Sequence, residues 1–166
     1  MSTTILCDFS RVLLIPKDPN YTGKLNRLHK DLFKKDPNYH FFDYFIFNEE
    51  LLNYFKSLKP RYSLHIFTTG TVQNHPDSRK VIDPIFETIF SAEEYSLHKN
   101  APHAYIFIAR KLNKTPEEIF FIDDKRQNVE AALKTRLTAV QYKNNGSLLA
   151  SLRENKITWV EIFLQV

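Results

Sequence analysis

The chain has 166 residues, 43% of them hydrophobic and 25% charged, which fits a single globular domain, residues 1–166, with one core. The net charge of +4 mildly favours anionic partners, but the basic residues are scattered, so no nucleic-acid partner is expected. No run approaches the ~20 apolar residues that cross a bilayer, no secretory signal is visible, and one cysteine excludes an internal disulfide. We therefore expect a cytoplasmic protein with no membrane partner.

Apolar periodicity and turn residues divide the chain into alternating strands and helices. In chain order the pattern predicts a strand 4–9, an apolar run 11–15, a helix 23–35, an aromatic run 40–47, a helix capped by Asn48, a strand 61–68, a helix and a strand within 81–90, a helix 102–112, a helix start at Thr115, a strand 119–122, a helix 128–135, a strand 138–142 and a helix 148–155. The apolar segment 157–166 could add another strand. Such alternation predicts an α/β fold, a Rossmann-like three-layer sandwich with a mainly parallel sheet.

Polar residues follow three of the predicted strands. Asp8 follows the first, Thr68 ends the strand 61–68, and Asp123 and Asp124 follow the strand 119–122. Each of them alone has an ordinary interpretation as a turn former, a helix cap or a loop residue, and Lys99 alone reads as a surface lysine. Because ligands of open parallel sheets bind beyond the carboxyl ends of the strands, the combination predicts the place of the chemistry.

These pieces resemble the four motifs of the haloacid dehalogenase-like (HAD) hydrolase superfamily. The motifs correspond to residues 5–13, 65–70, 91–105 and 118–132, and the resemblance extends over 5–142. The motifs look like those of subfamily I, near the branch of small sugar-phosphate phosphatases and the N-terminal domains of epoxide hydrolases. The resemblance implies a reduced cap insert after the first strand, at residues 16–47, too short for a full helical cap.

The resemblance also implies a magnesium-dependent phosphatase that acts on a small phosphorylated metabolite through an aspartyl-phosphate on Asp8. A phosphate ester repels an attacking carboxylate, and Mg²⁺ offsets that repulsion. The expected metal ligands are Asp8, the main-chain carbonyl of Ser10, Asp123 and Asp124. The expected catalytic residues are Asp8, Thr68 and Lys99, and the expected substrate-binding residues are Ser10, Arg11, Thr69, Gly70 and Asn128.

Two positions depart from the pattern of the superfamily. Ser10 stands where many of its phosphatases place a second acid, and losing general acid–base help usually costs about 10²–10⁴-fold in rate. Asn100 replaces the proline that usually follows the lysine of the third motif. Ser10, Arg11 and the reduced cap motivate an alternative, a catalytically weak or inactive protein that binds a phosphorylated ligand or a protein partner.

Other interpretations stay open or are disfavoured. The aromatic run 40–47 either packs against the main domain or forms a wall near the substrate mouth, and His75 could reach a substrate. Carbon–halogen hydrolysis needs no metal, so the acidic pair Asp123 and Asp124 argues against it. A receiver-type phosphoacceptor domain would carry its acidic pair at the first strand. The chain could be a monomer or a homodimer.

Overall fold

A five-stranded parallel sheet forms the centre of the computed structural model, which describes residues 3–158. Its strands, in spatial order, are β5 (Thr88–Ser91), β4 (Ser63–Thr68), β1 (Thr4–Cys7), β6 (Ile119–Asp123) and β7 (Thr138–Gln141). All neighbouring strands of this sheet pair in parallel. The predicted α/β class with a mainly parallel sheet is confirmed.

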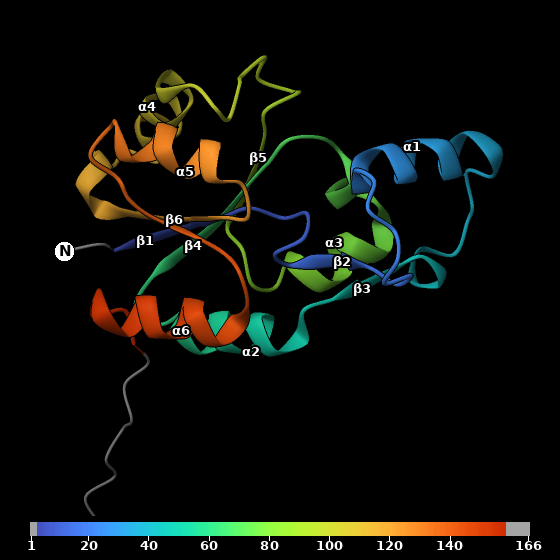
Figure 1. Cartoon of the computed structure of the whole chain (residues 1–166), viewed down its shortest axis with the longest axis horizontal. Coiled ribbons are helices and arrows are strands. Elements are labelled where there is room, and N and C mark those ends of the chain that lie inside the picture. Colours follow the sequence, from blue (N-terminus) through green and yellow to red (C-terminus); the bar gives the residue numbers. More distant parts are fainter. Residues whose placement is uncertain (1–2, 159–166) are drawn as a thin grey trace, which may run out of the picture.

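Helices cover both faces of the sheet, which gives the three layers seen in Figure 1. The helices α2 (Glu49–Leu58) and α6 (Asn145–Glu154) lie on one face, and α4 (Pro102–Lys111) and α5 (Arg126–Leu133) lie on the other. Successive strand residues alternate between the two faces. Ile5 and Cys7 of β1 therefore belong to the core under α2 and α6, and Leu6 belongs to the core under α4 and α5.

The segment between β1 and α2 forms a small unit of its own secondary structure. It contains β2 (Leu14–Pro16), α1 (Leu25–Lys35), a short 3-10 turn η1 (Phe41–Asp43) and β3 (Phe45–Phe47). The strands β2 and β3 pair antiparallel, so the two ends of the segment meet. Phe41 and Phe45 of the aromatic run are fully buried in the same core as Ile5, whereas Phe42 and Tyr44 are exposed. The run packs against the main domain.

Several predicted element boundaries were wrong, for local reasons. The helix expected within 81–90 is α3 (Pro76–Ile82), because the Nδ1 atom of His75 accepts a hydrogen bond from the N–H of Asp77 (3.2 Å) and Pro76 suits the first helical position. The helix expected at Thr115 is one 3-10 turn, η3 (Pro116–Glu118), which ends where β6 begins. The strand considered for 157–166 falls mostly outside the described residues.

Within residues 3–158, no helix is both long enough and apolar enough to cross a membrane.

Candidate active site

The sheet brings the predicted acidic residues together at the carboxyl ends of two of its interior strands, β1 and β6. Asp8 directly follows the central strand β1, Asp123 ends the adjacent strand β6, and Asp124 is the next residue. Carboxylate oxygens of the three residues lie within 4.8 Å of one another. Thr68 ends β4, on the other side of β1, and is fully buried.

Lys99, from the loop between β5 and α4, lies at the centre of this group. Its Nζ atom is 2.6 Å from Oδ1 of Asp8 and 2.7 Å from Oδ2 of Asp123, and it donates to the main-chain oxygen of Phe67 (2.7 Å). The three donors of the ammonium group thus have three acceptors. Tyr105, buried in α4, donates a hydrogen bond to the carbonyl of Lys99 (2.6 Å) and fixes the loop.

The two acids after β6 have different surroundings. Both oxygens of Asp123 accept hydrogen bonds, from the Asn128 amide (3.1 and 3.0 Å) and, at Oδ1, from the N–H of Lys125 (2.8 Å). Oδ1 of Asp124 is buried and has no hydrogen-bond partner among residues 3–158. Asp123 is therefore held as an anchor for Lys99, and Asp124 presents an oxygen that a cation could bind.

Burial and mutual repulsion perturb the acids of the site. Burial and the neighbouring Asp123 raise the pKa of Asp8 from 3.8 to about 7, although Lys99 opposes the shift. Burial, followed by Asp123, also raises the pKa of Asp124. Burial favours the neutral form of Lys99, but Asp8 and Asp123 outweigh it and raise the pKa of the ammonium group. Three carboxylates and one ammonium group leave an excess of negative charge, and these hard oxygen ligands suit Mg²⁺.

The loop after β4 is shaped by hydrogen bonds that the sequence did not reveal. The carbonyl of Gly70 accepts from Nε2 of Gln73 (2.7 Å) and Oγ of Ser91 (2.8 Å). Oδ1 of Asn26, in α1, accepts from the N–H groups of Thr71 and Val72, both at 3.0 Å. A methyl group on Gly70 would collide with the Asn26 side chain, so this close approach requires glycine. Oγ1 of Thr68 is buried without a hydrogen-bond partner among the described residues.

A cavity of about 370 Å³ opens onto Asp8 and Asp124. Of the predicted substrate-binding residues, Ser10, Arg11, Thr69 and Gly70 line it. Asn128 does not; its amide holds Asp123 instead. The wall supplied by the insert is the stretch 22–27 at the start of α1, and no residue of the aromatic run 40–47 lines the cavity. The interpretation of that run as a wall of the substrate mouth was wrong.

Arg11 has a left-handed backbone conformation, and its side chain makes hydrogen bonds to the main chain of another segment. Its φ of 66° lies in the left-handed region, which favours glycine over residues with a side chain. The guanidinium group donates hydrogen bonds to the main-chain oxygens of Tyr21 (3.0 Å) and Gly23 (2.7 Å). Arg11 thus ties the loop after Asp8 to the segment that precedes α1.

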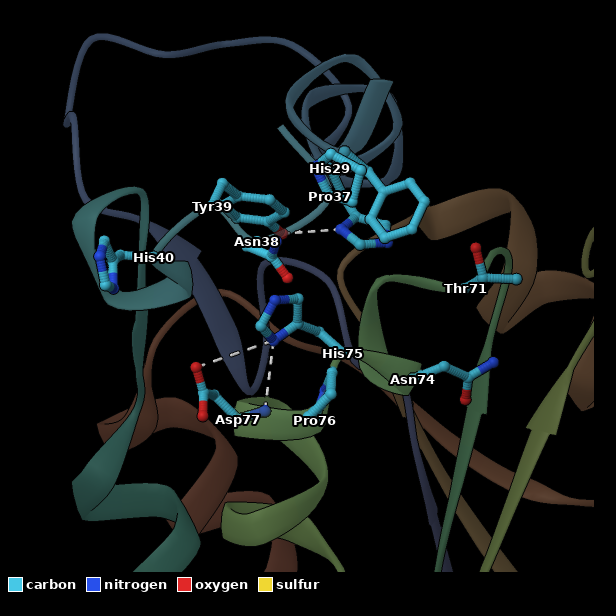
Figure 2. Close-up of a pocket in the computed structure, with 11 residues that line it drawn as sticks. His29, Pro37, Asn38, Tyr39, His40, Thr71, Asn74, His75, Pro76 and Asp77 are labelled. Carbon is cyan, nitrogen blue, oxygen red and sulfur yellow. Dashed lines mark hydrogen bonds and ion pairs between the residues drawn. The ribbon is translucent and has the colours of Figure 1, made fainter. Parts of the chain in front are cut away.

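A second cavity, of about 510 Å³, lies between α1, the segment before η1 and the start of α3 (Figure 2). Nδ1 of His29 lies 2.7 Å from the Tyr39 hydroxyl, and His75 stacks on Phe41, with ring centroids 4.8 Å apart. Burial lowers the pKa of both histidines. This cavity shares no lining residue with the first, so His75 does not line the cavity that opens onto Asp8.

Solved structures that superimpose on this chain include HAD proteins and a dehalogenase. A HAD family enzyme of Bacteroides thetaiotaomicron, in complex with magnesium and inorganic phosphate, superimposes with a TM-score of 0.66 at 13% identity, over 90% of this chain and 99% of that chain. A predicted HAD-like family hydrolase of Porphyromonas gingivalis gives 0.64 at 15% identity, over 94% and 98%. A 2-haloacid dehalogenase of Pseudomonas syringae gives 0.59 at 12% identity, over 86% of each chain. No protein-family profile and no curated protein matches the sequence.

Proposed function

We propose that this chain, which has the fold of the HAD enzymes, is a magnesium-dependent phosphoester hydrolase with Asp8 as its nucleophile. The observation that carries the proposal is the contact of one buried lysine, Lys99, with Asp8 and Asp123, next to the unpartnered oxygen of Asp124. The magnesium and phosphate bound by the Bacteroides thetaiotaomicron enzyme of the same fold support it.

Each residue of the site would have a definite task. Asp8 would attack phosphorus, so that a bond forms to its carboxylate oxygen while the bond to the leaving oxygen breaks. Lys99 would hold the carboxylate in one orientation and neutralise charge on the phosphoryl group. Thr68 and the main-chain N–H groups of Thr69 and Gly70 would bind the phosphoryl oxygens. Water would then attack the aspartyl-phosphate, release inorganic phosphate and restore Asp8.

The acidic residues fit a bound Mg²⁺. Asp8, Asp124 and the main-chain carbonyl of Ser10 would hold the ion, and Asp123 would orient Lys99 beside it. When bound, Mg²⁺ would offset the negative charge of the substrate and of the carboxylates. The same charge would favour the ionised form of Asp8, which the nucleophile needs and which burial opposes.

Ser10 limits the chemistry that the site can perform unaided. A serine hydroxyl cannot donate a proton to a leaving alkoxide as a carboxylic acid does, so that proton would have to come from solvent. Oγ of Ser10 is buried and has no hydrogen-bond partner within residues 3–158. We therefore expect slow turnover of alkyl phosphates.

The direct test is release of p-nitrophenol from p-nitrophenyl phosphate, with the native chain and Asp8→Asn assayed side by side in Mg²⁺ and in EDTA. We expect release that requires both Mg²⁺ and Asp8. Glu93→Gln is a matched carboxylate-to-amide control at the rim of the same cavity. Equal background from the native chain and Asp8→Asn would contradict the proposal.

Ser10 also supports a second candidate, a protein that binds a phosphorylated ligand or a partner without turning it over. In that case, calorimetry would show binding of inorganic phosphate in the presence of Mg²⁺, and no phosphoester of a broad panel would be hydrolysed.

A further inference from the structure

Basic side chains surround the mouth of the Asp8 cavity. Lys24 and Arg27 come from the wall that the insert supplies, and Lys125 comes from the loop after β6. Lys24 and Lys125 form no ion pair with any residue of the range 3–158. Arg27 lies 3.8 Å from Asp31, but both side chains are largely exposed, and such pairs bind weakly. All three cations are thus available to a ligand.

Little negative charge opposes them at the rim. Apart from Asp8 and Asp124, the only carboxylate among the residues that line this cavity is Glu93. Lys30 lies 2.9 Å from Glu93 and compensates its charge. The first turn of α1 also carries no acidic residue, so its positive dipole end adds to the potential of the side chains.

The basic wall, residues 22–27, is fixed to the rest of the protein by hydrogen bonds. Arg11 donates hydrogen bonds to the carbonyls of Tyr21 and Gly23 at its start, and Asn26 within it accepts from two N–H groups of the loop after β4. A preorganised wall binds a ligand without first losing conformational freedom.

The cavity also offers more room than the reacting group needs. Its volume of about 370 Å³ is in the range of pockets that enclose a whole small molecule, roughly 300–1,000 Å³. A phosphoryl group at Asp8 leaves the part of the cavity beside Lys24 and Arg27 for the remainder of the substrate.

We propose, building on the hydrolase function above, that the substrate carries a second anionic group, bound by Lys24, Arg27 and Lys125 while its phosphoryl group lies at Asp8. A carboxylate and a second phosphate share this chemistry. The substrate class is therefore a small phosphoester with a carboxylate or a further phosphate a few bonds from the scissile one.

The test compares three substrates with the same carbon skeleton: glycerol 3-phosphate, 3-phosphoglycerate and glycerol 1,3-bisphosphate. Release of inorganic phosphate gives kcat/KM for each. We expect at least one doubly anionic substrate to exceed glycerol 3-phosphate by about tenfold, mainly through a lower KM. The better of the two identifies the second group as carboxylate or phosphate.

The relevant ratio is kcat/KM of the better doubly anionic substrate divided by kcat/KM of glycerol 3-phosphate. In the double variant Lys24→Gln/Arg27→Gln, this ratio should fall close to one. The control Lys34→Gln/Lys35→Gln removes the same charge from the last turn of the same helix, outside the cavity, and should preserve the ratio. Raising the salt concentration to about 0.5 M should also reduce the native ratio, because exposed charges are screened.

The outcomes separate the two proposals. Hydrolysis of p-nitrophenyl phosphate with equal kcat/KM for all three glycerol substrates, or an undiminished ratio in Lys24→Gln/Arg27→Gln, would overturn the second-anion site and leave the phosphatase intact. If no substrate is hydrolysed, the phosphatase proposal fails, and calorimetric titration with 3-phosphoglycerate and glycerol 3-phosphate decides the second-anion site. Equal affinities would then overturn it, and tighter binding of 3-phosphoglycerate that depends on Lys24 and Arg27 would support it.

Discussion

The Nζ atom of Lys99 lies 2.6 Å from Asp8 and 2.7 Å from Asp123, so one ammonium group joins the carboxylates at the ends of two adjacent strands. The side chains of all three residues are at most 7% exposed. Burying charges is costly unless they are paired, so the three groups depend on one another.

Replacing Lys99 by Met should destabilise the metal-free protein by about 3–5 kcal/mol, because two buried carboxylates lose their partner. Urea unfolding at pH 8 in EDTA measures the loss, which should shrink at pH 5, where Asp8, whose pKa is raised to about 7, takes up a proton. Lys30→Met removes an exposed ion pair and should cost less than about 1 kcal/mol. If Lys99→Met and Lys30→Met lower the free energy of unfolding equally, the buried network would contribute no more to stability than an exposed ion pair.

The raised pKa of Asp8 predicts that this carboxylate destabilises the folded protein in a pH-dependent way. Its pKa is about 7 in the folded protein and 3.8 in the reference state, so the folded state binds the proton more tightly. This group's contribution to stability therefore falls as the pH rises from about 4 to 7. Metal-free Asp8→Asn should be more stable than the native chain at pH 8, on the order of 2 kcal/mol.

Thermal unfolding in EDTA at pH 4.5 and pH 8 tests this prediction. The advantage of Asp8→Asn should be large at pH 8 and nearly absent at pH 4.5. Asp43→Asn, at an exposed position, should give no pH-dependent advantage. An Asp8→Asn advantage that is equal at both pH values would contradict the raised pKa.

The contact of Gly70 with Asn26 predicts a non-additive pair of mutations. Gly70→Ala should destabilise the protein by about 1–3 kcal/mol, because the new methyl group collides with the Asn26 side chain. In the background of Asn26→Ala, the same substitution should cost less, since the colliding atoms are gone. A double-mutant cycle from urea unfolding measures the coupling, and additive costs would mean that the two residues do not constrain each other.

Ser10→Asp should restore proton donation to the leaving group. We expect kcat/KM for glycerol 3-phosphate to rise by about 10–10²-fold, with a smaller gain for p-nitrophenyl phosphate, whose leaving group needs little protonation. Ser10→Asn introduces a side chain of similar size that cannot donate such a proton, and serves as the matched control. A similar response to both substitutions would show that the missing acid does not limit the rate.

The sequence was sufficient to predict the sheet and the residues at its edge. β1 and β6 are mainly apolar runs; Asp8 follows the first, Asp123 ends the second, and ligands of parallel sheets bind beyond the carboxyl ends of the strands. The pattern does not by itself give the order of the strands, so the expectation that Asp8, Asp123 and Asp124 share one site comes from the resemblance to the HAD superfamily. The elements that the pattern missed depend on weaker local signals. His75 is not among the residues that usually cap a helix, so the sequence does not mark the start of α3.

The wall of the cavity could not be predicted, because it depends on contacts between distant parts of the chain. Asn26 binds the N–H groups of Thr71 and Val72, and nothing in its own neighbourhood marks it for that contact. The same holds for Arg11, which the resemblance implied as a substrate-binding residue but whose guanidinium group binds the main-chain oxygens of Tyr21 and Gly23. Lys24 and Arg27 have the pattern of an ordinary solvated helix face, and only the fold places them beside the cavity.

The burial of Phe41 and Phe45 has a consequence for how this protein could be re-engineered. Both rings belong to the core that also contains Ile5 and Phe55, so residues 16–47 do not form a detachable module. Exchanging this segment for another one would open the hydrophobic interior as well as alter the substrate mouth. Changes of specificity are therefore more accessible through single substitutions on the exposed side of residues 22–27 than through loop grafting.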